Sequence, residues 1–164
     1  MKVRDMYKRY WEAPERTDTT EAKTLFLGGG ITGCPEWQFP VSQRLLDETN
    51  LTLYNPRRKN WTFGDSETDD WTQIRWEFRH LAKSNMIMFW FPEETLCPIV
   101  LFELGKFIMV PDKELFVGVH PNYPRKRDVY IQLELERPDI IISDNLEHMV
   151  DDIIESVDTN PTSF

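Results

Sequence analysis

The chain has 164 residues and a formal net charge of −9, with 40% hydrophobic and 13% aromatic residues. A chain of this length and composition is expected to form one domain and can bury a core without disulfides, so a disordered protein is excluded. The negative charge argues against polymeric nucleic acid or an anionic membrane surface as partner, while a local basic pocket for one phosphate stays compatible with it.

The cysteines and histidines indicate neither a disulfide framework nor a zinc site. Only Cys34 and Cys97 are present, and the histidines His80, His120 and His148 lack ligand spacing. We therefore expect no metal and no cofactor. The N-terminus lacks an apolar signal core and no apolar run approaches the length of a membrane span, so we expect a soluble cytoplasmic protein.

Three parts follow one another along the chain. Residues 1–23 are charged and without clear periodicity, and we interpret them as an N-terminal arm, either loosely held or forming a short added helix. Residues 24–158 are expected to form the domain, and the polar residues 159–164 a loose tail.

Within the domain, short apolar runs alternate with segments of helical periodicity. The expected strands are 24–27, 51–54, 85–91, 114–119 and 139–143, and the expected helices are 36–48, 70–83, 97–110, 127–136 and 145–157. This alternation predicts an α/β fold with a five-stranded parallel sheet, Rossmann/flavodoxin-like strand order 2-1-3-4-5, and helices on both faces.

The helix at 70–83 carries an apolar stripe that we expect to face the core. The stripe consists of Trp71, Ile74, Phe78 and Leu81 at helical spacing. We expect Asp69 or Asp70 to cap the start of this helix.

Three segments should meet at the carboxyl ends of the strands, where the strand order reverses. They are the glycine-rich turn at 28–33, the polar loop at 57–70 and the turn before the helix at 97–110. The run Gly28-Gly-Gly30 either brings backbone amides close to a ligand or forms a tight strand-to-helix turn, and both interpretations stay open. The run does not match the spaced dinucleotide-binding fingerprint.

Two glutamates are the candidate catalytic residues. Glu103 lies among apolar residues of its helix, where an unused carboxylate is costly to bury; the alternative is a surface residue that pairs with Lys106. Glu77 lies on the preceding helix, and its alternative is a surface pair with Arg79 or Lys83. Two carboxylates facing one crevice are the equipment for cleaving a bond at an anomeric carbon.

Three blocks of the sequence resemble the signature motifs of the nucleoside 2-deoxyribosyltransferase family. They are Phe26-Leu-Gly-Gly-Gly-Ile-Thr-Gly33, Trp76-Glu-Phe-Arg-His-Leu-Ala-Lys-Ser-Asn-Met-Ile-Met88 and Leu101-Phe-Glu-Leu-Gly105. The resemblance implies that Glu103 is the nucleophile and that Glu77, eight residues before Asn85, manages the proton of the departing base. It also implies a homo-oligomer, a dimer or larger, in which a neighbouring subunit completes the site.

Three positions depart from the family pattern, and the first is Glu77, where many members have an aspartate. Phe26 stands where many members have a tyrosine whose hydroxyl holds the nucleophile, and Cys97 stands where several have an aspartate that reads the base. The segment Asn55-Pro-Arg-Arg58 with Trp61 resembles a subfamily of transferase-like proteins, many of them from phages and bacteria.

The remaining candidate substrate-binding residues come from the turn, the polar loop and the helices. They are Gly28, Gly29, Gly30, Ile31, Thr32, Asn55, Arg57, Trp61, Trp76 and Cys97. Arg57 is considered either as a ligand of a 5′-phosphate or as a solvated loop residue, and Trp61 as a stacking partner of a base.

The expected function is a nucleoside 2′-deoxyribosyltransferase acting on a small-molecule nucleoside or nucleotide. The alternatives are a nucleoside 5′-monophosphate N-glycosidase, which is a hydrolase, and a module that binds a nucleotide-derived ligand without cleaving it.

Overall fold

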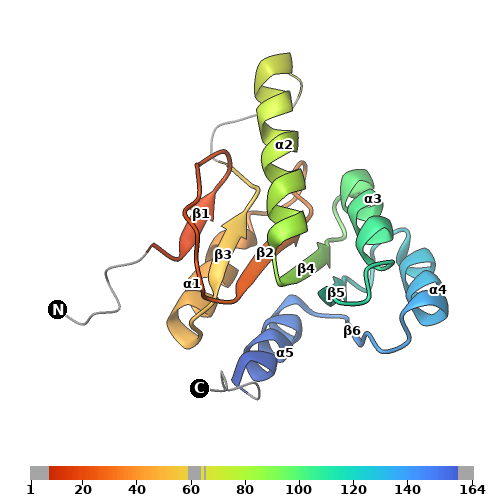
Figure 1. Cartoon of the computed structure of the whole chain (residues 1–164). Helices are drawn as coiled ribbons and strands as arrows, with labels where there is room; N and C mark the ends of the chain where they lie inside the picture. Colours follow the sequence, from red (N-terminus) through yellow and green to blue (C-terminus); the bar gives the residue numbers. More distant parts are fainter. Residues whose placement is uncertain (1–7, 59–63, 65, 159–164) are drawn as a thin grey trace.

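The computed structural model describes residues 8–58, 64 and 66–158, which form a parallel six-stranded sheet between two layers of helices (Figure 1). The strands are β1 (Tyr10–Glu12), β2 (Thr24–Gly29), β3 (Thr52–Asn55), β4 (Met86–Phe91), β5 (Glu114–Val119) and β6 (Ile142–Ser143). The helices are α1 (Gln38–Glu48), α2 (Glu67–Lys83), α3 (Pro98–Phe107), α4 (Lys126–Glu136) and α5 (Leu146–Asp158). The strand order is β1-β3-β2-β4-β5-β6.

The predicted α/β class is confirmed, whereas the predicted strand count is one too low. The five expected strands lie in the expected order, and β1 adds a sixth beside β3. Tyr10 pairs with Leu53, and Trp11, which pairs with Tyr54, is buried. Three residues are too few to show the alternation of apolar and polar side chains that indicates a strand. The structure of this segment is therefore decided by its pairing with β3 and not by its own sequence pattern.

Helix α2 differs from its prediction at its start and in its buried face. Its N-cap is Ser66, whose hydroxyl accepts a hydrogen bond from the Asp69 amide at 3.4 Å, so the expectation of an aspartate cap is wrong. The expectation that Trp71 packs in the core is also wrong, because its side chain is 61% exposed. The helix instead buries the face that carries Gln73, Trp76, His80 and Leu81.

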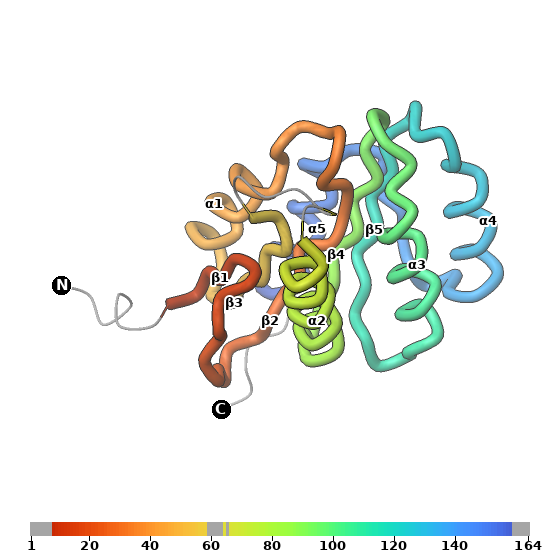
Figure 2. Tube along the Cα trace, turned by 90° about the horizontal axis from the view of Figure 1, so that it is seen from above, coloured from red at the N-terminus to blue at the C-terminus, as the bar shows by residue number. Residues whose placement is uncertain are grey.

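Each face of the sheet has its own core. Helices α2, α3 and α4 cover one face, and α1 and α5 cover the other, as the view along the sheet in Figure 2 shows. The first core includes Phe26, Ile87, Phe89, Leu104 and Val117, and the second includes Leu27, Val41, Leu45, Met88 and Ile153. Alternation along β2 and β4 therefore divides their side chains between the two layers.

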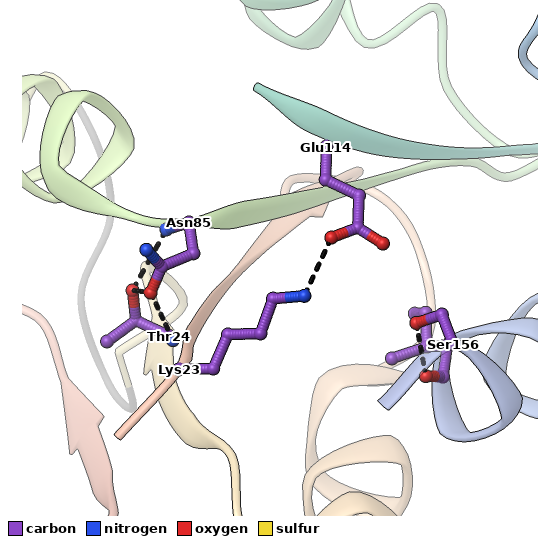
Figure 3. A network of polar contacts seen from close by, with 6 residues as sticks. Lys23, Thr24, Asn85, Glu114 and Ser156 are labelled. Atoms are coloured by element: carbon purple, nitrogen blue, oxygen red, sulfur yellow. Dashed lines mark hydrogen bonds and ion pairs between the residues drawn. The ribbon is translucent and has the colours of Figure 1, made fainter. Parts of the chain in front are cut away.

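Polar contacts hold the amino-terminal ends of β2, β4 and β5 in register (Figure 3). The Asn85 carboxamide oxygen accepts hydrogen bonds from the Thr24 amide at 2.8 Å and hydroxyl at 3.0 Å. Lys23 pairs with Glu114 at 2.8 Å across the start of β5. With these ends fixed, the carboxyl ends of β2 and β4 come together at the opposite edge of the sheet.

Close packing explains the three consecutive glycines at the end of β2. A Cβ atom on Gly28 would lie 2.7 Å from the Met88 carbonyl oxygen, and one on Gly29 would lie 2.6 Å from the Trp37 ring. Gly29 also has a φ of +147°, which L-residues with a side chain rarely adopt. The glycine run is therefore required by the approach of β2 to β4 and α1, whatever else its backbone contacts.

None of the helices within the described ranges is both long and apolar enough to span a bilayer.

Candidate active site

A cavity of about 450 Å³ lies between α2 and α3, above the carboxyl-terminal part of β2. Its lining residues are Phe26, Gly28, Gly29, Gly30, Ile31, Thr32, Pro56, Gln73, Ile74, Glu77, Phe78, Leu81, Thr95, Cys97, Pro98, Ile99, Val100, Phe102, Glu103, Lys106 and Phe107. This volume suits a nucleoside-sized ligand, and the wall is mostly apolar with a few polar groups, as is usual for small-molecule sites.

The three sides of the cavity follow from the topology. Strand β2 supplies the floor through Phe26 and the glycine backbone, and α2 and α3 stand side by side above it (Figures 1 and 2). Helix α3 starts abruptly, because Cys97 adopts a left-handed φ of 51° and Pro98 follows at the first turn. This turn directs α3 back along the sheet, so that Glu103 faces the cavity.

The two predicted catalytic residues line this one cavity from facing helices. Glu77 comes from α2 and Glu103 from α3, and both side chains are half-buried. Burial, together with the charge of Glu77, raises the pKa of Glu103 to about 8, although Lys106 acts in the opposite direction. Burial also raises the pKa of Glu77. The two carboxyl groups are thus close enough for the charge of one to oppose ionisation of the other.

Gln73 orients Glu77, a role that the sequence analysis missed. Its side-chain amide nitrogen donates to the Pro56 carbonyl and to Glu77 Oε1, both at 2.7 Å. The second bond favours the charged form of Glu77 and opposes the rise in its pKa. Gln73 is only 2% exposed, and its Oε1 has no hydrogen-bond partner among the described residues. The i, i+4 spacing of Gln73 and Glu77 was the available signal.

The structure has neither of the surface ion pairs considered as alternatives. No ion pair joins Glu103 to Lys106; the Lys106 ammonium lies over the Phe78 ring, 4.3 Å from its centroid. Arg79 and Lys83, the possible partners of Glu77, line a different cavity. Among the described residues, neither Glu77 nor Glu103 therefore forms an ion pair with a cation.

The predicted substrate-binding residues divide into two groups. Those on the cavity wall are Gly28, Gly29, Gly30, Ile31, Thr32 and Cys97. Asn55, Arg57 and Trp76 are not among the lining residues, and Trp61 lies outside the described part of the chain.

Cys97 forms a neutral part of the wall. It is 4% exposed, and burial raises the pKa of its thiol to about 12. Its sulfur lies 3.6 Å from the Thr95 carbonyl oxygen. Cys97 therefore presents a neutral group where a carboxylate would present a charge.

Asn55 and Arg57 brace the loops at the sheet edge. The Asn55 side chain donates to the Tyr10 hydroxyl and accepts from the Arg57 amide, both at 2.9 Å. The Arg57 guanidinium donates to the carbonyl oxygens of Pro35 at 2.9 Å and Cys34 at 3.1 Å. These contacts use donors that a phosphate would need, so the Arg57 guanidinium is occupied by the loop before α1.

Trp76 faces away from the cavity. Its indole nitrogen donates to the Glu15 carbonyl at 2.8 Å, and its ring stacks on His80 with centroids 3.9 Å apart. It therefore fastens the N-terminal segment to α2 and is not available to stack on a base between α2 and α3.

The family comparison covers the entire cavity. A family model described as nucleoside 2-deoxyribosyltransferase like matches residues 22–123, a range that contains both glutamates and every lining residue. A search among curated proteins found no match. The matched range spans more than half of the chain and confirms the resemblance seen in the three sequence blocks. The chain therefore belongs to the nucleoside 2-deoxyribosyltransferase-like family.

Proposed function

We propose that the protein transfers a deoxyribosyl group between nucleobases, cleaving the N-glycosidic bond of a deoxynucleoside. The observation that supports this proposal is the pair Glu77 and Glu103, which face one nucleoside-sized cavity in a chain of this family. Two carboxylates across an apolar crevice match the requirements of an oxocarbenium-like reaction at C1′.

In the first half-reaction, the Glu103 carboxylate attacks C1′ and forms a glycosyl ester. The C1′–N bond breaks, its electron pair stays on the base nitrogen, and Glu77 supplies the proton that neutralises the departing base. In the second half, a nitrogen of another base attacks C1′, releases the Glu103 carboxylate and returns a proton to Glu77. If water attacks instead, the same residues perform hydrolysis.

This mechanism requires that the two carboxyl groups share one proton. Glu77 must carry that proton, and Glu103 must be ionised. Before a substrate binds, Glu103 holds the proton better than Glu77, because burial and the Glu77 charge raise the pKa of Glu103 to about 8 while the Gln73 hydrogen bond favours charged Glu77. Phe26 supplies no hydroxyl to offset this. We propose that hydroxyl groups of the bound sugar, together with Lys106, stabilise the charged form of Glu103. The single proton of the carboxyl pair then resides on Glu77.

The lining favours a nucleoside over a nucleoside 5′-monophosphate. Lys106 is the one cation among the described lining residues, and its ammonium already lies over Phe78. A phosphate clamp usually adds an arginine or several aligned backbone amides. The N-glycosidase activity is therefore the second candidate.

Base exchange tests the proposal directly. The protein is incubated with a deoxynucleoside and a different free base, and liquid chromatography follows both bases. We expect the new deoxynucleoside to appear only when the second base is present. Release of free sugar without an acceptor would favour the hydrolase. Saturable nucleoside binding with no base release, across purine and pyrimidine donors with and without a 5′-phosphate, would contradict an enzymatic function.

We further propose that the protein is a homo-oligomer whose neighbouring copy covers the cavity rim. Exposed apolar side chains border the opening on both helices, including Phe78 on α2 and Phe102 on α3, which is 73% exposed. Contiguous apolar surface of this kind marks an interface more often than a free surface.

Phe102→Lys should shift the protein towards the monomer in light scattering coupled to size exclusion, because it introduces a charge into the proposed contact. Leu135→Lys, on α4 and 77% exposed, is the matched control and should leave the mass unchanged. A monomeric parent protein at micromolar concentration would contradict this proposal without bearing on the chemistry.

A further inference from the structure

A second cavity, of about 470 Å³, lies on the opposite side of α2 from the candidate active site. Residues 14–17 and one face of α2 line it, and its charged lining residues are Glu15, Arg16, Arg75, Arg79 and Lys83. The two cavities share no lining residue. One wall comes from residues 14–17, which precede the family match, so this cavity combines α2 with a segment outside the matched range.

Four cations surround this cavity in a chain whose net charge is −9. Arg75, Arg79 and Lys83 recur every four residues and so lie on one face of α2, and Arg16 faces them from the N-terminal segment. Among the described residues, no carboxylate lies within ion-pair distance of any of the four. This concentration of unpaired positive charge favours an anionic ligand.

Glu15, the single acidic residue among the described lining residues, already has partners outside the cavity. One carboxylate oxygen of Glu15 pairs with Lys8, and the other accepts from the Glu12 amide at 3.1 Å. Glu15 therefore does not neutralise the arginines of the cavity.

A hydrogen-bond network that includes the neutral imidazole of His80 and the ammonium of Lys83 fixes the wall without using the arginines. His80 Nδ1 lies 2.7 Å from the Trp76 carbonyl, so that nitrogen carries the proton and Nε2 accepts from the Thr17 hydroxyl at 2.9 Å. The Thr17 oxygen in turn accepts from Lys83 at 2.7 Å. Burial lowers the pKa of His80 to about 4, so the network is stable with a neutral imidazole at pH 7. The wall is thus preorganised, whereas the guanidinium groups of Arg16 and Arg79 have no described hydrogen bond.

We propose that this cavity binds a phosphate-bearing small molecule. Arg75 and Arg79 would grip phosphate oxygens through paired N–H donors, with Arg16 closing from the N-terminal segment. The volume accommodates a ligand the size of a nucleotide. The proposal is independent of the reaction at Glu77 and Glu103, because it involves other residues in a separate cavity.

Calorimetric titration with pyrophosphate at constant ionic strength tests this site in the full chain. We expect saturable binding of one equivalent, weakened at least about tenfold in the double variant Arg75→Gln, Arg79→Gln. Arg125→Gln, which changes an exposed arginine immediately before α4, should bind like the parent protein. Both arginines of α2 are exposed, so we expect the double variant to fold, and its thermal unfolding is measured alongside.

A second readout locates the ligand. In proton–nitrogen correlation spectra, the Trp76 indole resonance, assigned by its loss in Trp76→Phe, should move as pyrophosphate is added. Undiminished binding to the double variant, or an unmoved Trp76 resonance at saturation, would overturn the proposal. Tight binding of a single-stranded oligonucleotide that displaces pyrophosphate would overturn it in favour of a nucleic-acid surface.

Discussion

Replacing Glu103 with glutamine should lower kcat for base exchange by at least about 10³-fold, because a neutral amide cannot form the glycosyl ester. The substitution preserves the shape of the side chain, so binding of the nucleoside should change little. Initial rates by chromatography, with calorimetry for binding, separate the two effects. Glu134→Gln, an exposed glutamate on α4, is the matched control and should retain full activity. A Glu103→Gln variant with a tenth of the parent activity would contradict nucleophilic catalysis.

The same substitution should make the folded protein more stable in alkaline solution. The ordinary pKa of 4.5 is raised to about 8 in the folded chain, so folding holds the Glu103 proton more tightly than the unfolded chain does. This contribution to stability is therefore lost as the pH rises from about 4.5 to about 8. Glutamine carries no such penalty, and we expect a gain on the order of 2 kcal/mol at pH 9, after allowance for partial solvent screening.

Thermal unfolding at two pH values checks this expectation. At pH 9 the Glu103→Gln variant should melt roughly 4–8 °C above the parent protein, and at pH 4 the two should coincide. An equal difference at both pH values would attribute the gain to packing and not to the charge. Loss of activity combined with a gain in stability is the signature of a residue retained for function.

The sequence predicted the sheet well because buried parallel strands are visible as short apolar runs. The runs at 24–27 and 85–91 correspond to β2 and β4, and their adjacency follows from the strand order of such sheets. The meeting of Glu77 and Glu103 in one cavity was predictable for the same reason, since both helices lie on the same face beside these central strands.

The face of α2 could not be predicted from its apolar periodicity. Ile74 and Phe78 have the spacing of a core stripe, yet they border the cavity and are more than half exposed. The buried positions include polar side chains, Gln73 and His80, whose partners come from distant segments. The spacing of apolar residues indicates that a helix has an apolar side. It does not indicate whether that side contacts the sheet, a ligand or another subunit.

Arg57 illustrates a second limit. A loop arginine is an attractive phosphate ligand in a sequence, but here its donors satisfy backbone carbonyls of the loop before α1. Such carbonyls have no signature in the sequence, because every residue carries one. The cationic face of α2 was visible as Arg75, Arg79 and Lys83, but its opposing wall depends on where residues 14–17 fold.

Replacing Glu77 with glutamine should change the shape of the pH profile as well as the rate. In the parent protein the reactive form carries one proton on the carboxyl pair, so kcat/KM should fall above pH 8, where Glu103, with a pKa of about 8, loses that proton. Removing the Glu77 charge lowers the pKa of Glu103, because that charge is one of the causes of its rise. The variant should therefore show activity that rises with pH to a plateau, with a midpoint below 8 and no falling limb.

The loss of rate in Glu77→Gln should depend on the leaving base. For an ordinary deoxynucleoside we expect kcat to fall about 10²- to 10⁴-fold, the usual contribution of a positioned general acid. For 7-methyl-2′-deoxyguanosine the fall should be small, because its base already carries a positive charge and departs without receiving a proton. Glu103→Gln should be equally inactive on both donors. Equal losses on both donors in Glu77→Gln would contradict proton transfer by Glu77 and leave it only an electrostatic or positioning role beside Glu103.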